Sequence, residues 1–468
     1  MGDRCLRSLL VAAAAVLCLH VPTACAEETL TFGRFGTVHL YRESPQPSRA
    51  VLFASGDGGW NLGVIDMARS LASLDTLVVG IDVTHYLREL ARSGDSCSYP
   101  AADFEGLSHY VQKKLDLERY SPPVLVGYSS GATLVYAVLV QAPPGTFAGA
   151  ISLGFCPDLP LSKPFCKGSG LAWEQGPKGK GVSFLPAAGL EAPWVAFQGA
   201  IDQVCDPAAT VVYAKKIPGA EIVLLPKVGH GFSVQKNWMP QFREAFSRVA
   251  RKASGPPSTA LTEVADLPLV EVPSSRNPAG PLLAVILSGD GGWAGLDREV
   301  AGALAAKGVP VVGWNSLQYY WRPRTPEGAA QDLARILRHY LASWRAEEAV
   351  LVGYSLGADV LPFLVNRLPA DLRKRVRLVA LLGPAERASF EFRLSDWLGG
   401  PDSGSRPVLP EVERLAGTRV LCLYGKGEEG ALCPRLDASS VEIAARDGGH
   451  HFAGDYQGLA EEILRAAR

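Results

Sequence analysis

The sequence has almost no net charge, because 46 Lys and Arg residues face 47 Asp and Glu residues. A protein without an overall positive field has little attraction for a polyanion, so we expect no nucleic-acid partner. The chain also contains no Cys-x-x-Cys and no His-Glu-x-x-His sequence. These are the common signatures of zinc sites, so we expect no metal and no cofactor.

Long apolar runs are confined to the amino terminus. Arg4 and Arg7 precede an apolar stretch from Leu9 to Leu19, and Ala24-Cys25-Ala26 then supplies the small residues of a cleavage site. The pattern predicts a secretory signal peptide over residues 1–26, too short in its apolar part to cross a bilayer. A lipid-modified Cys25 is the less favoured alternative, because Pro22 fits that motif poorly. The mature protein is therefore expected in the periplasm.

Cysteine usage agrees with export. Six cysteines remain after the signal peptide, and an even number in an oxidising compartment favours disulfides over buried free thiols. Proximity along the chain favours two pairs, Cys156 with Cys166 and Cys422 with Cys433.

The mature sequence contains two copies of the same series of motifs. The string SGDGGW at residues 55–60 recurs at 288–293, VLVGYSSGA at 124–132 recurs as VLVGYSLGA at 350–358, and GHGF at 229–232 recurs as GHHF at 449–452. The copies are about 220 residues apart, a spacing that fits duplicated domains and not a solenoid repeat. We predict an amino-terminal domain over residues 27–252, a Gly- and Pro-containing linker over 253–265, and a carboxyl-terminal domain over 266–468.

Each copy alternates short apolar runs with helical patterns, which is typical of a mostly parallel sheet flanked by helices. The helix at residues 332–344, for instance, places its apolar side chains on one face. Buried strands are predicted at 50–54, 76–81, 124–127, 150–153, 194–198 and 222–225, and at 283–287, 309–314, 350–353, 376–382, 420–424 and 441–444. The fold class is therefore α/β, with two tandem domains.

The repeated Gly-x-Ser-x-Gly strings place Ser129 and Ser355 between a strand and a helix. This is the context of a nucleophile elbow, a strained turn that exposes a serine hydroxyl. A serine needs a base to accept its proton. The repeated Gly-His strings supply His230 and His450, the latter followed by His451.

A carboxylate should orient each histidine. Asp202 lies three residues after Gly199, and Glu428 lies three residues after Gly425, with Glu429 as the alternative acid. The order serine, acid, histidine is that of α/β-hydrolases. The two candidate sets are therefore Ser129, Asp202 and His230, and Ser355, Glu428 and His450.

The remaining need is an oxyanion hole, built from the amide that follows the serine and one from a glycine-rich loop. Leu356 and Gly291 are the candidates in the second copy. A carboxylate would disfavour a developing oxyanion, so Asp290 is expected to point away from it, toward a cationic part of the substrate. Asp359 is a second candidate for that contact. The alternative for Asp359 is a helix-surface or capping role. The Lys- and Gly-rich segment 160–181 is unique to the first copy, and a solvated insertion is favoured over a lid that contacts lipid phosphates.

With these motifs in place, the sequence resembles the AcvB/VirJ family of bacterial virulence proteins in its two-domain, AcvB-like form. The resemblance rests on SGDGGW at 288–293, GYSLGADVLPF at 353–363, LLGP at 381–384, FEF at 390–392, DWLG at 396–399 and GGHHF at 448–452, with LGFCPD at 153–158 and CKGSG at 166–170 in the first half.

The resemblance implies a periplasmic serine hydrolase that removes the aminoacyl group, chiefly lysyl, from aminoacyl-phosphatidylglycerol. It further implies that the carboxyl-terminal copy is catalytic, through Ser355 and His450, and that the protein is linked to virulence and type IV secretion. The alternatives are a non-catalytic periplasmic adaptor for type IV secretion substrates and an esterase or lipase of other specificity.

Overall fold

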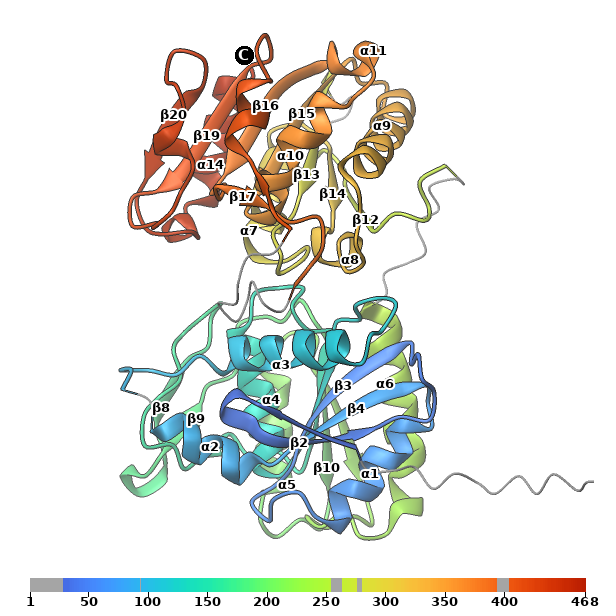
Figure 1. Ribbon diagram of the computed structural model, residues 1–468. Helices are drawn as coiled ribbons and strands as arrows, with labels where there is room; N and C mark the ends of the chain where they lie inside the picture. The colour runs from blue at the N-terminus through green and yellow to red at the C-terminus, as the bar shows by residue number, and fades with distance from the viewer. Residues whose placement is uncertain (1–27, 93, 254–262, 276–279, 394–403) are drawn as a thin grey trace, which may run out of the picture.

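The computed structural model describes residues 28–92, 94–253, 263–275, 280–393 and 404–468, and Figure 1 shows that they form two lobes. The predicted signal peptide and most of the predicted linker lie outside the described residues. Among those residues, no helix combines the length and the apolar character needed to cross a bilayer.

The amino-terminal lobe is built on an eight-stranded sheet in the order β1-β2-β4-β3-β5-β6-β10-β11. Neighbours from β4 to β11 are parallel, whereas β1 pairs with β2, and β2 with β4, in the antiparallel sense. The strands are β1 (Glu28–Phe32), β2 (Gly36–Tyr41), β3 (Arg49–Ala54), β4 (Thr76–Ile81), β5 (Val124–Tyr128), β6 (Gly149–Leu153), β10 (Trp194–Gly199) and β11 (Glu221–Leu225).

Helices cover both faces of this sheet, so each face has its own apolar core. Burial on both faces explains why the central strands read as continuous apolar runs. The helices are α1 (Leu62–Ala72), α2 (Val83–Ala91), α3 (Pro100–Lys114), α4 (Ser130–Gln141), α5 (Pro207–Lys215) and α6 (Met239–Ala253).

The carboxyl-terminal lobe repeats the plan with seven strands in the order β12-β14-β13-β15-β16-β19-β20. Only β12 is antiparallel to its neighbour. The strands are β12 (Leu269–Val272), β13 (Leu282–Leu287), β14 (Val311–Trp314), β15 (Glu348–Tyr354), β16 (Val376–Leu382), β19 (Val420–Gly425) and β20 (Glu442–Arg446), with a small pair β17 (Arg387–Ala388) and β18 (Arg406–Pro407). The helices are α7 (Gly295–Ala306), α8 (Ser316–Tyr319), α9 (Pro326–Ser343), α10 (Leu356–Asn366), α11 (Ala370–Arg373), α13 (Leu409–Glu413) and α14 (Tyr456–Ala466).

All twelve predicted strands are present, with ends that differ by one or two residues. Strand β14, for instance, begins two residues later than predicted, after Pro310, which has no N–H to donate to a ladder. The predicted helix at 332–344 lies within α9, apart from its last residue. The fold class predicted from the sequence is confirmed.

Three disulfides join the six cysteines: Cys97–Cys166, Cys156–Cys205 and Cys422–Cys433. The prediction for Cys422 with Cys433 is confirmed, and the prediction for Cys156 with Cys166 is wrong. Cys156 and Cys205 follow β6 and β10, which are neighbours in the sheet, so their sulfurs meet at its carboxyl edge.

The segment at 160–181 is folded onto the amino-terminal lobe and is not simply solvated. The Cys166 N–H donates to the Ser98 carbonyl, and Phe165 and Leu171 are buried. The segment carries β8 (Trp173–Gln175), which pairs with β9 (Val182–Phe184); β9 in turn pairs with β7 (Asp158–Leu159). Most of its other residues are exposed, so the predicted solvated insertion is attached to the lobe at a few buried positions.

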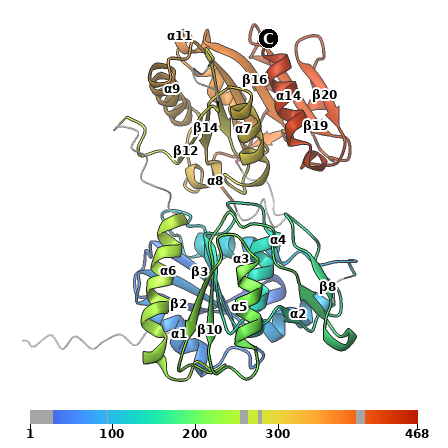
Figure 2. The same ribbon diagram turned by 180° about the vertical axis from the view of Figure 1, so that it is seen from behind.

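The lobes meet through α3, which lies along the side of the amino-terminal lobe that faces its neighbour (Figures 1 and 2). Lys113 Nζ donates to the Trp321 carbonyl at 2.7 Å and contacts Glu391 Oε1 at 3.1 Å, and Trp321 Nε1 donates to the Leu117 carbonyl at 2.7 Å. Tyr120, Leu317, Trp321 and Phe392 form an apolar cluster between the lobes. These buried contacts fix how one lobe is placed on the other.

Candidate active site

Both candidate nucleophiles occupy the strained turn that their motifs predict. Ser129 has φ 55° and ψ −123°, and Ser355 has φ 50° and ψ −121°. Positive φ is unfavourable for a residue with a Cβ and persists where the surroundings enforce it. The Ser129 N–H donates to the Leu153 carbonyl and the Ser355 N–H to the Leu382 carbonyl, each at 2.9 Å. Each turn is therefore held by the neighbouring strand.

The flanking glycines are required by close backbone contacts. A Cβ on Gly127 would lie 2.1 Å from the Gly131 carbonyl oxygen, and one on Gly131 would lie 2.2 Å from the Ser55 carbonyl oxygen. In the second copy a Cβ on Gly353 would lie 2.4 Å from the Gly357 carbonyl oxygen, and one on Gly357 would lie 2.2 Å from the Leu287 carbonyl oxygen. The Gly-x-Ser-x-Gly spacing thus follows from the packing of strand, turn and helix.

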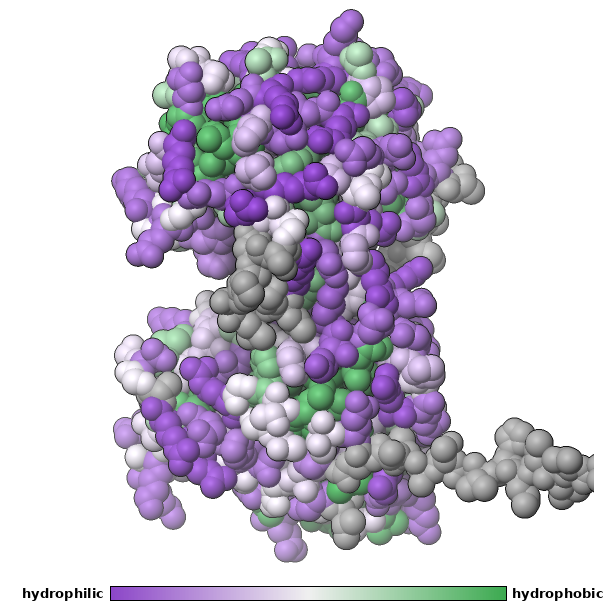
Figure 3. All heavy atoms as spheres, viewed as in Figure 1, coloured by the Kyte–Doolittle hydropathy of each residue, from purple (hydrophilic) through white to green (hydrophobic). Residues whose placement is uncertain are grey.

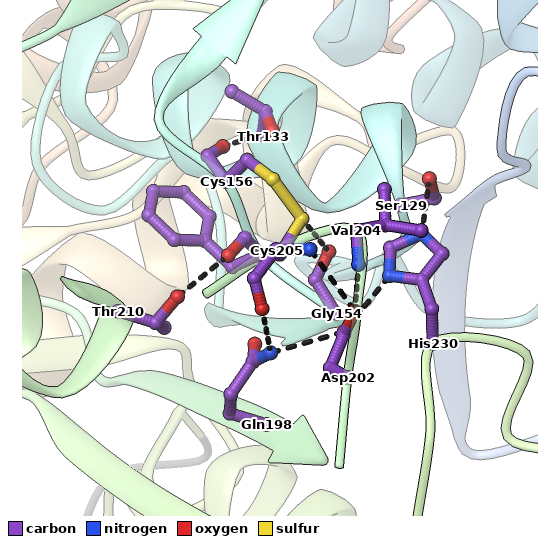
Figure 4. Close-up of a disulfide and its surroundings, with 11 residues drawn as sticks. Ser129, Thr133, Gly154, Cys156, Gln198, Asp202, Val204, Cys205, Thr210 and His230 are labelled. Carbon is purple, nitrogen blue, oxygen red and sulfur yellow. Dashed lines mark hydrogen bonds and ion pairs between the residues drawn. A yellow bond between two sulfur atoms is a disulfide. The ribbon is translucent and has the colours of Figure 1, made fainter. Parts of the chain in front are cut away.

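The amino-terminal set forms a continuous hydrogen-bonded row (Figure 4). His230 Nε2 lies 2.9 Å from Ser129 Oγ, and His230 Nδ1 lies 2.8 Å from Asp202 Oδ2. The structure therefore brings together all three residues of this predicted set.

Several groups hold Asp202 in place. Its Oδ1 accepts the N–H groups of Val204 and Cys205, and its Oδ2 accepts Nε2 of Gln198 at 3.0 Å. The Cys156–Cys205 disulfide anchors the same loop, as Figure 4 shows. Asp202, Cys205 and His230 are close enough to share a metal ion, but the disulfide removes the thiolate that such a set would need.

In the carboxyl-terminal set the acid and the base are paired. His450 Nδ1 lies 2.5 Å from Glu428 Oε1, and the Gly425 N–H donates to Glu428 Oε2. Burial alone would raise the pKa of Glu428, but these hydrogen bonds outweigh it and hold the pKa below its usual value. Glu429, the alternative acid, is exposed.

The second set differs from the first in the contact between its serine and its histidine. No hydrogen bond joins their side chains, although both belong to the described part of the chain. His450 nevertheless occupies the equivalent place: its ring lies against Gly383 as the ring of His230 lies against Gly154. The second set is thus assembled except for the serine–histidine contact.

The glycine-rich loop after β13 lies beside the second elbow. A Cβ on Gly289 would be 3.2 Å from the Tyr354 ring and 3.5 Å from Ser355 Cβ, so a larger residue would require the ring to shift by a few tenths of an ångström. The Gly292 N–H donates to the Gly289 carbonyl. Gly291 makes no hydrogen bond through its N–H within the described residues, which keeps it, with Leu356, as an oxyanion-hole candidate.

The family model for VirJ, described as bacterial virulence protein (VirJ), matches residues 48–148 and 281–468. The chain belongs to the VirJ family. The two matched segments fall in the two lobes, and no curated protein matches the chain.

Solved structures similar to this VirJ-family chain each align with about half of it. An esterase domain of a Rhodothermus marinus protein is 16% identical over 48% of this chain and 98% of its own, with a TM-score of 0.34. XC6422 of Xanthomonas campestris, described as an α/β serine hydrolase without a lid, is 22% identical over 49% and 95%, with a TM-score of 0.31. Est1E of Butyrivibrio proteoclasticus is 11% identical over 48% and 99%, with a TM-score of 0.33.

His450 of the second set lines a cavity of about 900 Å³ between the lobes of the VirJ-family chain, whereas Ser355 and Glu428 are not among its lining residues. The carboxyl-terminal lobe lines it with His450, His451, Tyr354 and the Gly289–Gly292 loop, which includes Asp290. Tyr354 Oη lies 3.0 Å from His451 Nδ1, and burial lowers the pKa of His451. His450, the predicted base, and Asp290, one of the residues predicted to contact a cationic part of the substrate, therefore line the same cavity.

Asp359 is placed elsewhere. It is 8% exposed, it does not line the cavity, and its Oδ1 accepts the Ala385 N–H at 2.6 Å. Burial raises its pKa well above the usual range. Asp359 thus ties α10 to the segment after β16, and its contact with the substrate stays a prediction.

Sequence reasoning missed four acidic residues that line this cavity: Glu105 on α3, Glu191, and Asp297 and Glu299 on α7. Asp297 is 2% exposed, and its Oδ1 has no hydrogen-bond partner within the described residues. No motif marked Glu105, because its place depends on how two distant lobes dock. The sequence did mark Asp297, because it is a charged residue beside the otherwise apolar face of its helix.

Proposed function

We propose that this chain is a periplasmic serine ester hydrolase that cleaves the aminoacyl ester of aminoacyl-phosphatidylglycerol, with lysyl as the preferred acyl group. The observation that carries the proposal is the carboxyl-terminal site: an elbow serine, a Glu428–His450 pair, and a cavity with acidic walls that His450 lines. Membership of the VirJ family and three disulfides, which suit an oxidising compartment, support it.

The reaction follows from the positions of these groups. Glu428 faces His450 Nδ1 and so holds the ring with Nε2 available as a base. Rotation of the Ser355 side chain toward that nitrogen completes the triad. Ser355 Oγ then attacks the aminoacyl carbonyl carbon while His450 Nε2 accepts the hydroxyl proton.

Collapse of the tetrahedral intermediate breaks the bond between the acyl carbon and the glycerol oxygen. That oxygen leaves with the proton held by His450, as phosphatidylglycerol. Water then attacks the acyl-enzyme, gives its proton to His450 and releases the free amino acid, and the proton returns to Ser355. The N–H groups of Gly291 and Leu356 would stabilise the oxyanion at both stages.

Acidic walls favour a cationic acyl group. Lysyl esters carry two ammonium groups, which gain from nearby carboxylates when water is excluded. The face of the molecule in Figure 3 is mostly hydrophilic, which suits a protein that takes a lipid headgroup from a membrane surface. A scaffold protein, the alternative, would have no use for strained serines at two equivalent turns.

The amino-terminal set supports a second candidate function, that of an additional esterase site, because its row from Ser129 to Asp202 is complete. A fluorophosphonate probe tests both. The proposal predicts that Ser355→Ala abolishes labelling of the carboxyl-terminal lobe and leaves labelling of Ser129. Absence of label from both serines in the folded protein would favour the non-catalytic adaptor.

A further inference from the structure

The cavity beside His450 has a wall supplied by the other lobe. Glu105 of α3 and Tyr99, the residue before that helix, line it together with Pro143, Pro144 and the Gly289–Gly292 loop. The Gly295 N–H donates to the Pro144 carbonyl, so the two lobes meet directly at the rim. A substrate in this cavity would contact residues from both copies of the duplicated design.

Glu105 belongs to a stripe of α3 that faces the carboxyl-terminal lobe. Residues 105, 109 and 113 are four apart and therefore share one helix face. The ring of His109 packs edge-on against Phe392, and Lys113 binds the Trp321 carbonyl. Glu105 Oε1 lies 3.6 Å from the point that a Cβ on Gly291 would occupy, so its carboxyl group lies against the oxyanion-hole candidate.

Two of the carboxyl groups in this recess, those of Glu105 and Asp297, have no Lys or Arg beside them among the described residues that line it. None of the described residues that line the cavity is Lys or Arg, and Glu105 forms no ion pair or hydrogen bond within the described residues. The buried Asp297 Oδ1 is likewise without a partner. Glu191 also lines the cavity, but it is paired with Arg298 at 2.5 Å.

Physical chemistry indicates what would fit here. Burial, together with the charge of Asp290, raises the pKa of Glu105 to about 8, and burial raises the pKa of Asp297 well above its usual range. Buried carboxyl groups that face one another ionise only at a cost, which a bound cation would remove. Each observation thus points to a positively charged ligand group.

We propose that Glu105 of the amino-terminal lobe is a specificity residue of the carboxyl-terminal active site, where with Asp297 it binds the ammonium groups of a dicationic acyl chain. The inference rests on the proposed function. Lysyl esters present two ammonium groups to this recess, whereas alanyl esters present one. An acyl group without a side-chain cation would gain no charge contact with these carboxyl groups, so the recess discriminates in favour of the dicationic ester.

The test uses the full-length chain with lysyl- and alanyl-phosphatidylglycerol in mixed micelles. Glu105→Gln should lower the ratio of kcat/KM for lysyl over alanyl by at least about tenfold, mainly through a higher KM for the lysyl ester. Fluorophosphonate labelling of Ser355 should be unchanged. Glu191→Gln is the matched control, because Glu191 lines the same cavity and is already paired; its ratio should stay that of wild type.

A second variant guards against misfolding. Glu105→Asp keeps the charge and shortens the side chain, so an intermediate ratio supports the inference. An unchanged lysyl preference in Glu105→Gln would overturn the inference and leave the proposed function intact. Failure of the wild-type protein to hydrolyse either ester would overturn the proposed function, and the inference with it.

Discussion

Gly357 follows Ser355 by two residues, and a Cβ on it would come within 2.2 Å of the Leu287 carbonyl oxygen. That oxygen is backbone within a buried strand and has no room to move. Gly357→Ala should therefore destabilise the carboxyl-terminal lobe by about 1–3 kcal/mol and displace the elbow. The melting temperature measures the first effect and the rate of Ser355 labelling measures the second, and we expect both to be lower than in wild type.

Gly302 provides the matched control for that substitution. It lies within α7 and is exposed, and a Cβ there would meet no atom within 4 Å. Gly302→Ala should raise the free energy of unfolding by about 0.5–1 kcal/mol, because alanine is the better helix former. A Gly357→Ala variant as stable and reactive as Gly302→Ala would contradict the close contact.

Glu428 predicts a pH dependence of stability. Its pKa lies below the usual 4.5 in the folded protein, since the hydrogen bonds from His450 and Gly425 outweigh its burial. The folded state thus favours the ionised carboxylate, and the stabilisation is present above the unfolded-state pKa and disappears as the pH falls through the folded-state value.

The corresponding variant is Glu428→Gln, measured against wild type from pH 7 to pH 3. Its melting temperature should lie below that of wild type at neutral pH, and the difference should shrink below about pH 4.5. A difference that stays constant over this range would show that the carboxylate charge contributes nothing to stability.

At the scale of elements, each lobe has a disulfide next to the loop that carries its acid. Cys205 lies three residues after Asp202, and the Cys422–Cys433 bridge encloses Glu428. The double variant Cys156→Ser, Cys205→Ser should lose about 2–4 kcal/mol of stability and loosen the Asp202 loop. We expect Ser129 labelling to slow by about tenfold, while Ser355 labelling stays at its original rate.

The third disulfide supplies the comparison. Cys97–Cys166 belongs to the same lobe but joins segments that carry none of Ser129, Asp202 and His230. Its double serine variant should lose comparable stability and keep Ser129 labelling. Equal loss of labelling in the two double variants would mean that general destabilisation, and not the Asp202 loop, is responsible.

The elements also show what a sequence can and cannot predict. Strands β3 and β4 are buried on both faces, so their apolar runs identify them directly. Strands β1 and β12 lie at sheet edges with exposed and half-buried residues, and their sequences give no such signal. The pairing of Cys156 was missed for a related reason, because adjacency in a sheet does not follow adjacency in the chain.

At the scale of the whole molecule, the duplication made the candidate sites predictable from the sequence. The way in which the two lobes dock could not be predicted from it. Two matching sets of serine, acid and histidine could be read from repeated strings, and the structure brings Ser129, Asp202 and His230 into contact and pairs His450 with Glu428; their catalytic roles remain predictions. The contact between Glu105 and the Gly291 loop joins residues from different lobes. No spacing or periodicity encodes such a contact.

Lysine release from lysyl-phosphatidylglycerol by the full-length protein tests the central claim most directly, with wild type, Ser129→Ala and Ser355→Ala assayed side by side. The account predicts that Ser355→Ala lowers the rate by at least about a thousandfold, as loss of a triad nucleophile should, while Ser129→Ala stays near wild type. Full activity in Ser355→Ala, or loss of activity in Ser129→Ala alone, would contradict it.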